Sequence, residues 1–205
     1  MSHPGSGRSK MKKKTFDHAK IEKAVTLMFE AIGEDIHREG IKKTPSRIAR
    51  AFEEIFDGCK YTNKEIAAAN KVLFDAPNDG LVVEKITGPG VNSMCEHHLL
   101  PMYDATVYVG YLPKGKVIGL SKLARIVQLC GHRPSLQEKW GADVAECVSL
   151  ATGASDIAVI ISAKHGCITF RGAKTDVTTK TAELTGRFKQ DSQLRAEFYN
   201  IIKDL

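Results

Sequence analysis

The order of strand-like and helix-like segments between residues 81 and 184 most constrains the fold of this chain. Branched and aromatic residues in "LVVEKIT" and "DATVYVGYLP" are typical of strands, whereas apolar residues at helical spacing mark "SKLARIVQLCG". In order, the segments are two strands, a short strand, two helices and two strands: 81–87, 104–113, 116–120, 121–131, 135–152, 156–162 and 176–184. This order predicts an α+β fold in which an antiparallel sheet packs on two helices.

Helical patterns flank this unit on both sides. Before it, a first helix is predicted over residues 16–32, with apolar residues at helical spacing: Ile21, Val25, Met28 and Ile32. A second helix is predicted in "TPSRIARAFEEIFDG", with Thr44 as N-cap, Pro45 at the first helical position and Gly58 as the stop. A last helix is predicted over 191–205, with Leu194, Phe198 and Ile201 on one face.

These patterns predict three parts of the chain. Residues 1–14 are a basic tail or an expression remnant, residues 15–77 form a helical region, and residues 78–205 form the α+β domain. The formal net charge is +6, and residues 8–14 alone contribute five positive charges. We therefore interpret the tail as a solvated segment rather than a nucleic-acid-binding arm.

The composition is that of a soluble globular protein, since 42% of the 205 residues are hydrophobic and 26% are charged. No apolar run approaches the roughly 18 residues that span a bilayer, and the N-terminus lacks the apolar core of an export signal. Five irregularly spaced cysteines indicate a reducing cytoplasm rather than a disulfide framework. Three of them lack other metal-binding neighbours and are predicted to be small buried residues: Cys59, Cys130 and Cys147.

The segment "SMCEHHLLPMY" places a cysteine, a glutamate and two histidines at consecutive positions, Cys95 to His98. A structural zinc site fills all four positions with protein ligands, whereas a catalytic site supplies three and leaves the fourth to water. Cys95 and His98 are three apart, so a helical turn would bring them to one side and send His97 elsewhere. With His165 or Cys167 of "KHGC" as the third donor, we interpret the group as a catalytic metal site. A chance polar turn is the alternative.

Basic residues near the start of the first long helix suggest a phosphate site. The segment "GLSKLAR" runs from a strand into a helix predicted to start at Ser121, with Lys122 and Arg125 on one face. The alternative is an ordinary N-cap with solvated basic neighbours. Arg171 and Cys167 share a face whether "KHGCITFRG" is helical or extended, which directs an arginine towards the metal.

Two further residue pairs have both a structural and a functional interpretation. Ser135 and Glu138 have the S-x-x-E spacing of a capping box, in which the glutamate only satisfies a backbone donor. Arg50 and Glu54 are four apart and could form an ion pair on one helix. Spacing alone does not decide between these interpretations and roles in substrate binding.

Taken together, these motifs resemble the GTP cyclohydrolase I family from about Ile32 to the C-terminus. The similarity begins with "GEDIHREGIKKTPSRIAR" and continues with "SMCEHHLLP", "YLPKGKVIGLSKLARIV", "LQE", "HGC" and "RG" in the family's order. The chain departs from the usual family pattern at "LQEKW", "PMYD" and "GHRP", none of which includes a predicted metal ligand. The resemblance implies the tunnelling fold, whose unit has the segment order given above.

The resemblance also implies roles for individual residues. Zinc is held by Cys95, His98 and Cys167, and protons are transferred by His97 and His165. The substrate GTP is bound by residues that recognise guanine, ribose and triphosphate: Gln137, Glu138, Ser121, Lys122, Arg125, Arg171, Arg47 and Arg50. The implied reaction opens the guanine imidazole ring, releases formate and forms 7,8-dihydroneopterin triphosphate, the first step of folate and pterin biosynthesis. The implied assembly is a decamer of two stacked five-membered rings with active sites between subunits.

Other functions predict sequence features that are missing here. A zinc nucleoside deaminase needs H-x-E followed by P-C-x-x-C, and the chain has no CxxC. A zinc-stabilised binding module needs a fourth protein ligand, for which the sequence offers no close-spaced candidate. A pterin or deazapurine enzyme on the same fold is disfavoured by the combination of "CEHH" and "HGC".

Overall fold

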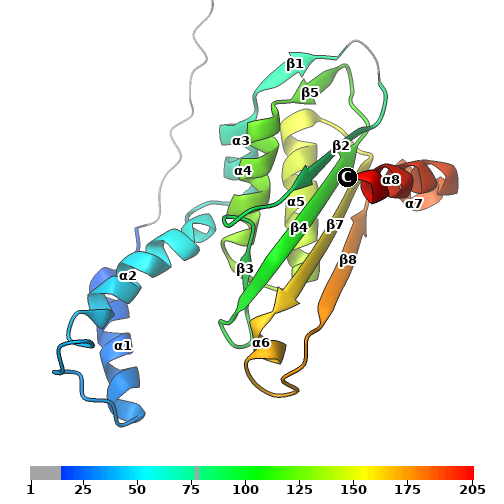
Figure 1. Ribbon diagram of the computed structural model, residues 1–205. Helices are drawn as coiled ribbons and strands as arrows, with labels where there is room; N and C mark the ends of the chain where they lie inside the picture. Colours follow the sequence, from blue (N-terminus) through cyan, green and yellow to red (C-terminus); the bar gives the residue numbers. More distant parts are fainter. Residues whose placement is uncertain (1–14, 77–78) are drawn as a thin grey trace, which may run out of the picture.

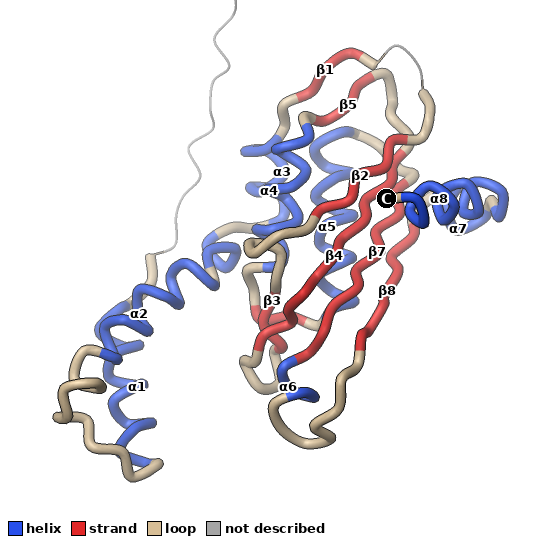
Figure 2. The backbone as a smooth tube through the Cα atoms, viewed as in Figure 1, coloured by secondary structure: helices blue, strands red, loops and turns tan. Residues whose placement is uncertain are grey.

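The computed structural model describes residues 15–76 and 79–205, so the predicted tail and the predicted boundary at residue 78 lie outside the described residues. In the described residues, helical segments come first, a run of strands follows, and helices and strands then alternate until two helices close the chain (Figures 1 and 2). In chain order, the elements are α1 (His18–Ala31), α2 (Thr44–Ile55), the 3-10 helix η1 (Asp57–Lys60), α3 (Asn63–Asn70), β1 (Leu73–Asp75), β2 (Val82–Ile86), β3 (Ser93–Cys95), β4 (Pro101–Tyr111), β5 (Lys116–Ile118), α4 (Leu120–Gly131), β6 (Pro134–Ser135), α5 (Gln137–Thr152), β7 (Ile157–His165), α6 (Gly166–Thr169), β8 (Thr178–Leu184), α7 (Arg187–Gln190) and α8 (Ser192–Asp204).

The main sheet confirms the predicted α+β class. Strands β2, β4, β7 and β8 lie side by side and pair antiparallel, while β3 pairs antiparallel with β4 and parallel with β6. Strands β1 and β5 form a separate two-stranded sheet. The short strands β1, β3 and β6 were not predicted, because two or three residues are too few for a period-2 pattern to be read.

Helices cover both faces of the sheet. Helices α3, α4 and α5 lie on one face, and α7 and α8 lie on the other (Figure 1). The strand β7 contributes to both layers: Val159 and Ile161 belong to the larger core beneath α4 and α5, whereas Ala158 and Ile160 pack with α7 and α8. A strand buried on both faces reads as a continuous apolar run, which is what "IAVII" shows.

Several helix ends differ from their predictions, and those of α2 and α4 have a structural reason or consequence. Helix α2 begins at Thr44, but its N-cap is Lys43, and the helix ends at Ile55 rather than at Gly58. Gly58 lies in η1, where an added Cβ would sit 1.9 Å from the backbone oxygen of Leu129, so the glycine allows a close approach of two backbones. Helix α4 begins at Leu120 with Gly119 as N-cap, one residue before the predicted start at Ser121.

Helices α1 and α2 pack on each other and project from the rest of the molecule as an arm (Figure 1). On α1, Val25 is buried, but Met28 and Ile32 of the same predicted stripe are 51% and 70% exposed. The following segment joins the main body, because α3 packs against α4 and α5 and β1 pairs with β5. Within the described ranges, no helix is long and apolar enough to cross a membrane.

Candidate metal centre and active site

A tight turn after β3 positions the first two predicted metal ligands. The backbone N–H of Leu99 donates to the oxygen of Cys95 at 2.8 Å, and the N–H of Cys95 donates to the oxygen of Leu100 at 2.9 Å. Leu99 has a φ of 52°, in the left-handed region that an L-residue seldom adopts. The turn therefore folds residues 96–98 back over the end of the strand, with Cys95 buried and His98 exposed.

The third predicted ligand comes from a helical turn at the end of β7. His165 is the last residue of the strand, and Gly166 begins the single turn of α6 that carries Cys167. A Cβ on Gly166 would lie 3.1 Å from both Phe170 and Pro101, so the chain changes direction where a larger residue would be crowded. The segment "KHGC" is thus extended at its histidine and helical at its cysteine.

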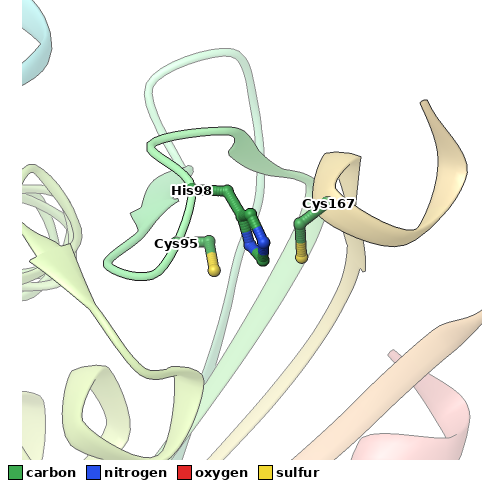
Figure 3. A group of neighbouring side chains, drawn as sticks. All are labelled: Cys95, His98 and Cys167. Carbon is green, nitrogen blue, oxygen red and sulfur yellow. The ribbon is translucent and has the colours of Figure 1, made fainter. Parts of the chain in front are cut away.

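These two turns bring Cys95, His98 and Cys167 together. One ligand atom from each residue lies within 4.8 Å of the others, and the three side chains point into the same space (Figure 3). Burial is the larger cause that raises the pKa of the Cys167 thiol, and the neighbouring thiol of Cys95 raises it further. A bound cation would remove this disadvantage by stabilising both thiolates, so the donors fit a metal ion. The group offers two sulfurs and one imidazole, and among the described residues no fourth donor joins it, which suits a metal that keeps one position open.

The two histidines predicted to transfer protons both lie beside this group. Nδ1 of His97 is 3.6 Å from Sγ of Cys95, so the turn keeps His97 close rather than sending it away as predicted. His165 is partly buried, and Nε2 lies 2.8 Å from Oε1 of Gln137. Burial lowers the pKa of His165, and the negative charge of Glu138 opposes this effect.

The start of α5 places Gln137 and Glu138 differently. Gln137 is only 2% exposed, and its amide group is surrounded by hydrogen-bond partners from β7 and β8. Glu138 is exposed, and α5 has Leu136 as N-cap with no side-chain capping bond. The capping-box interpretation of Ser135 and Glu138 is therefore wrong, and the carboxylate is available to a ligand.

Arg171 reaches the metal group, as predicted. Its Nη1 atom lies 3.2 Å from Nε2 of His98. The predicted alternative for Arg50 is not formed, since no ion pair joins it to Glu54 within the described part of the chain. Arg50 is exposed on α2, beside a cavity of about 480 Å³, and Arg47 is exposed on the same helix.

The predicted phosphate residues lie at the opposite end of the sheet from the metal group. The first residues of β4 lie at the same end of the sheet as the metal group, since Met102 of β4 pairs with His165 of β7. The other end of β4 carries Tyr111, whose hydroxyl accepts from the backbone N–H of Ile118, just before α4 begins. Strand β4 has 11 residues, which corresponds to about 34 Å. Helix α4, which carries the predicted phosphate residues Ser121, Lys122 and Arg125, therefore begins at the end of the sheet away from the metal group.

The remaining cysteines only partly follow their prediction. Cys130 and Cys147 are buried as expected, and their sulfurs lie 3.6 Å apart between α4 and α5. Cys59 is exposed, because η1 lies at the surface there. Sequence reasoning also missed Thr181, whose hydroxyl contacts Gln137 at 3.2 Å. The alternating pattern of "DVTTKTAEL" was the available signal, since it assigns Thr179 and Thr181 to one face of β8.

Together, the fold and the site define an α+β enzyme with a three-donor metal centre. The family model of GTP cyclohydrolase I matches residues 21–203. The chain belongs to the GTP cyclohydrolase I family.

Curated relatives cover nearly the whole chain. GTP cyclohydrolase 1 of Clostridium beijerinckii is 42% identical over 198 residues, which is 93% of this chain and 99% of the relative. GTP cyclohydrolase 1 of Clostridium botulinum strain Kyoto is 45% identical, over 83% of this chain and 90% of the relative. GTP cyclohydrolase 1 of Hyperthermus butylicus is 43% identical, over 91% of this chain and 92% of the relative.

Proposed function

We propose that this protein is a GTP cyclohydrolase I, which hydrolyses the guanine imidazole ring of GTP, releases formate and forms 7,8-dihydroneopterin triphosphate. This reaction is the first step of folate and pterin biosynthesis. The observation that carries the proposal is the convergence of Cys95, His98 and Cys167 from segments far apart in sequence, with two further histidines beside them. The family membership of the chain supports the same activity.

The metal in this proposal is zinc, held by Cys95, His98 and Cys167. Thiolate and imidazole ligands suit zinc better than they suit magnesium or calcium, which prefer oxygen. When bound, zinc would act as a Lewis acid and make a water molecule nucleophilic at neutral pH. Because two ligands are cysteine thiolates, the site needs a reducing compartment, and we assign the protein to the cytoplasm.

His97 and His165 are the groups that we assign to proton transfer. Water adds to C8 of guanine and the bond from C8 to one ring nitrogen breaks, which leaves a formamide on the other nitrogen. A second water then releases formate, and each nitrogen must gain a proton as its bond to C8 breaks. Histidine suits both halves of this exchange, because its ordinary pKa lies near neutrality. The lowered pKa of His165 favours its neutral form, which is ready to accept a proton.

Glu138 is the residue that we assign to guanine recognition, with Gln137 beside it. Guanine presents N1–H and the 2-amino group as two neighbouring donors, and a carboxylate accepts from both. Adenine has an acceptor at N1 and no 2-amino group, so the same carboxylate would lose both partners. The exposed position of Glu138, close enough to His165 to affect its pKa, supports this role.

The triphosphate and ribose are assigned to basic and hydroxyl groups from three parts of the chain. Arg171 lies at the metal end, whereas the others lie on α4 or on the arm: Ser121, Lys122, Arg125, Arg47 and Arg50. Strand β4 is about 34 Å long, and the metal group and the start of α4 lie near its opposite ends, so these two groups of residues are apart within one chain. We therefore propose that each active site combines the metal end of one subunit with α4 of a neighbour.

Assembly into a large homo-oligomer follows from this division of the site. The sheet edges at β2 and β8 are open in one chain, and open edges are normally paired or covered. Exposed Met28 and Ile32 on α1 offer a second apolar contact surface. We propose a decamer of two stacked pentamers, in which the sheet edges pair within each ring.

The direct test is incubation of the purified protein with GTP while formate and the pterin chromophore are measured together. Equal amounts of both products are expected, because one formate leaves for each pterin ring formed. ATP serves as the control substrate and is expected to give neither product. Formate without a pterin, or no reaction with GTP in zinc-loaded protein, would contradict the proposed activity.

A further inference from the structure

Both N–H donors of the Gln137 side chain are engaged within the protein, and its oxygen faces a histidine. Its Nε2 atom lies 2.9 Å from the backbone oxygen of Ile161, 3.1 Å from the backbone oxygen of Thr179 and 3.2 Å from Oγ1 of Thr181. Its Oε1 atom lies 2.8 Å from Nε2 of His165. The residue is 2% exposed, so α5, β7 and β8 enclose the amide on the inner side of the metal end.

The neighbours of this amide determine which way it points. Backbone oxygens of Ile161 and Thr179 can only accept hydrogen bonds, so the atom that faces them must be the NH₂ group of Gln137. The amide oxygen must then face His165. An amide oxygen only accepts, so Nε2 of His165 must donate, and it therefore carries a proton.

We infer that Gln137 is a positioning residue that fixes both the ring orientation and the tautomer of His165. With Nε2 protonated and engaged, Nδ1 is the ring nitrogen left to exchange protons in the reaction. The inference rests on the proposed function for the role of His165, and it assigns the side chain of Gln137 to the histidine rather than to guanine. Groups that hydrogen-bond a metal-bound histidine typically contribute about 10- to 100-fold to metal affinity or activity, and we take the same scale for the contact to His165.

The same arrangement explains why the two adjacent residues behave differently. Glu138 is exposed at the first turn of α5 and is free to bind a ligand, while Gln137 points into the body of the protein. A substitution that keeps the shape of Gln137 but removes its polar atoms should therefore affect turnover and leave substrate affinity nearly unchanged. A direct substrate contact would show the opposite pattern.

The test compares Gln137→Met with a matched control, Thr181→Val. Methionine has a similar length to glutamine but has no N–H donor and no amide oxygen. Thr181→Val removes one of the three contacts at Nε2 of Gln137 and leaves the two backbone oxygens in place. For zinc-loaded Gln137→Met we expect kcat to fall about 10- to 100-fold, with KM for GTP and zinc content close to those of the unmodified protein. Thr181→Val is expected to retain most of its kcat.

A spectroscopic measurement on the unmodified zinc-loaded protein tests the tautomer without any substitution at Gln137. Solid-state nitrogen–carbon correlation spectra of histidine-labelled protein, compared with His165→Ala, identify which ring nitrogen of His165 carries the proton. We expect the proton on Nε2 in the unmodified protein and a mixture of tautomers in Gln137→Met. A neutral His165 protonated on Nδ1, or a raised KM with unchanged kcat in Gln137→Met, would overturn the inference. Failure of the proposed function is distinguishable, because the unmodified protein would then release no formate from GTP.

Discussion

Nη1 of Arg171 lies 3.2 Å from Nε2 of His98, although 73 positions separate the two residues. A guanidinium always donates, so Nε2 of His98 accepts and carries no proton. The one lone pair at Nε2 cannot also bind a metal ion, so a metal that binds through this atom would take the place of the guanidinium contact. The segment around α6 therefore supplies both a thiol, from Cys167, and a cation, from Arg171, to the turn that follows β3.

The three-donor group predicts how the protein holds its metal. Purified protein should contain about one zinc per chain, because three ligands converge on one position. Cys95→Ser and Cys167→Ser should each lose zinc and activity, as measured by elemental analysis and the formate assay. Cys59→Ser, at an exposed thiol outside the group, is the control and should retain both. Full zinc retention in both site variants would mean that the ligands are misassigned.

His165 should be needed for chemistry and not for metal binding. It lies outside the group of three ligand atoms, so His165→Ala should keep its zinc. Loss of an acid–base residue typically lowers turnover by about 100-fold or more. Single-turnover kinetics with GTP would measure this loss, with His37→Ala at an exposed position as the control. Release of zinc from His165→Ala would show instead that this histidine is a ligand.

Glu138 should control the affinity for guanine. Glu138→Ala removes a charged acceptor, and hydrogen bonds to charged groups contribute about 1.5–3 kcal/mol, so KM for GTP should rise about 10- to 100-fold. Glu197→Ala, at an exposed carboxylate on α8, provides the matched control. Steady-state kinetics with GTP and circular dichroism would be measured together. An unchanged KM in a folded Glu138→Ala protein would rule out guanine recognition by this carboxylate.

Active sites shared between subunits should allow two inactive variants to restore each other. Cys167→Ser lacks the metal end, and Lys122→Ala/Arg125→Ala lacks the α4 end, but each keeps the part that the other has lost. In evenly mixed oligomers, about one site in four should contain both intact parts. Co-expression of the two variants, purification of the mixed oligomer and the formate assay would measure this recovery.

Two observations would contradict the shared site. One is a mixed oligomer with no more activity than its components, although both variants assemble. The other is an unmodified protein that light scattering at micromolar concentration shows to be a fully active monomer. A control co-expression uses Lys114→Ala, on the loop between β4 and β5, in place of the α4 double variant. Lys114→Ala should be active on its own.

Glu84 should make the protein less stable as the pH rises towards 7. Burial raises the pKa of this carboxyl from its ordinary 4.5 to about 7, and Oε1 has no hydrogen-bond partner among the described residues. A raised pKa means that the folded protein binds the proton more tightly than the unfolded chain does. Stability from this group is therefore present below about pH 4.5 and is lost as the pH rises to about 7.

Glu84→Gln keeps the shape of this side chain and removes its charge. At pH 8 the variant should be more stable by roughly 1–2 kcal/mol, a figure reduced from the full shift because the carboxyl is only half-buried. Urea unfolding at pH 5 and pH 8 would measure the difference, with Glu197→Gln on α8 as the exposed control. Equal destabilisation of Glu84→Gln at both pH values would contradict the buried, unpaired carboxylate.

The amino-acid sequence by itself determined the longer elements and the candidate metal-binding motif. Periodic apolar residues mark α4 because burial on one face imposes a repeat that is visible locally, and its apolar residues Leu123, Ile126 and Val127 are all buried. The motif "CEHH" identifies a metal-binding turn for a similar reason, since ligands within one turn are close whatever the rest of the chain does.

Contacts between distant segments depended on the tertiary structure. Cys167 joins Cys95 because β7 pairs with β4 in a register that brings His165 opposite Met102, and a register between strands is not encoded in either strand alone. The buried amide of Gln137 is known only once β7 and β8 enclose it. The placement of the metal group and the start of α4 near opposite ends of β4 is likewise a property of the folded sheet.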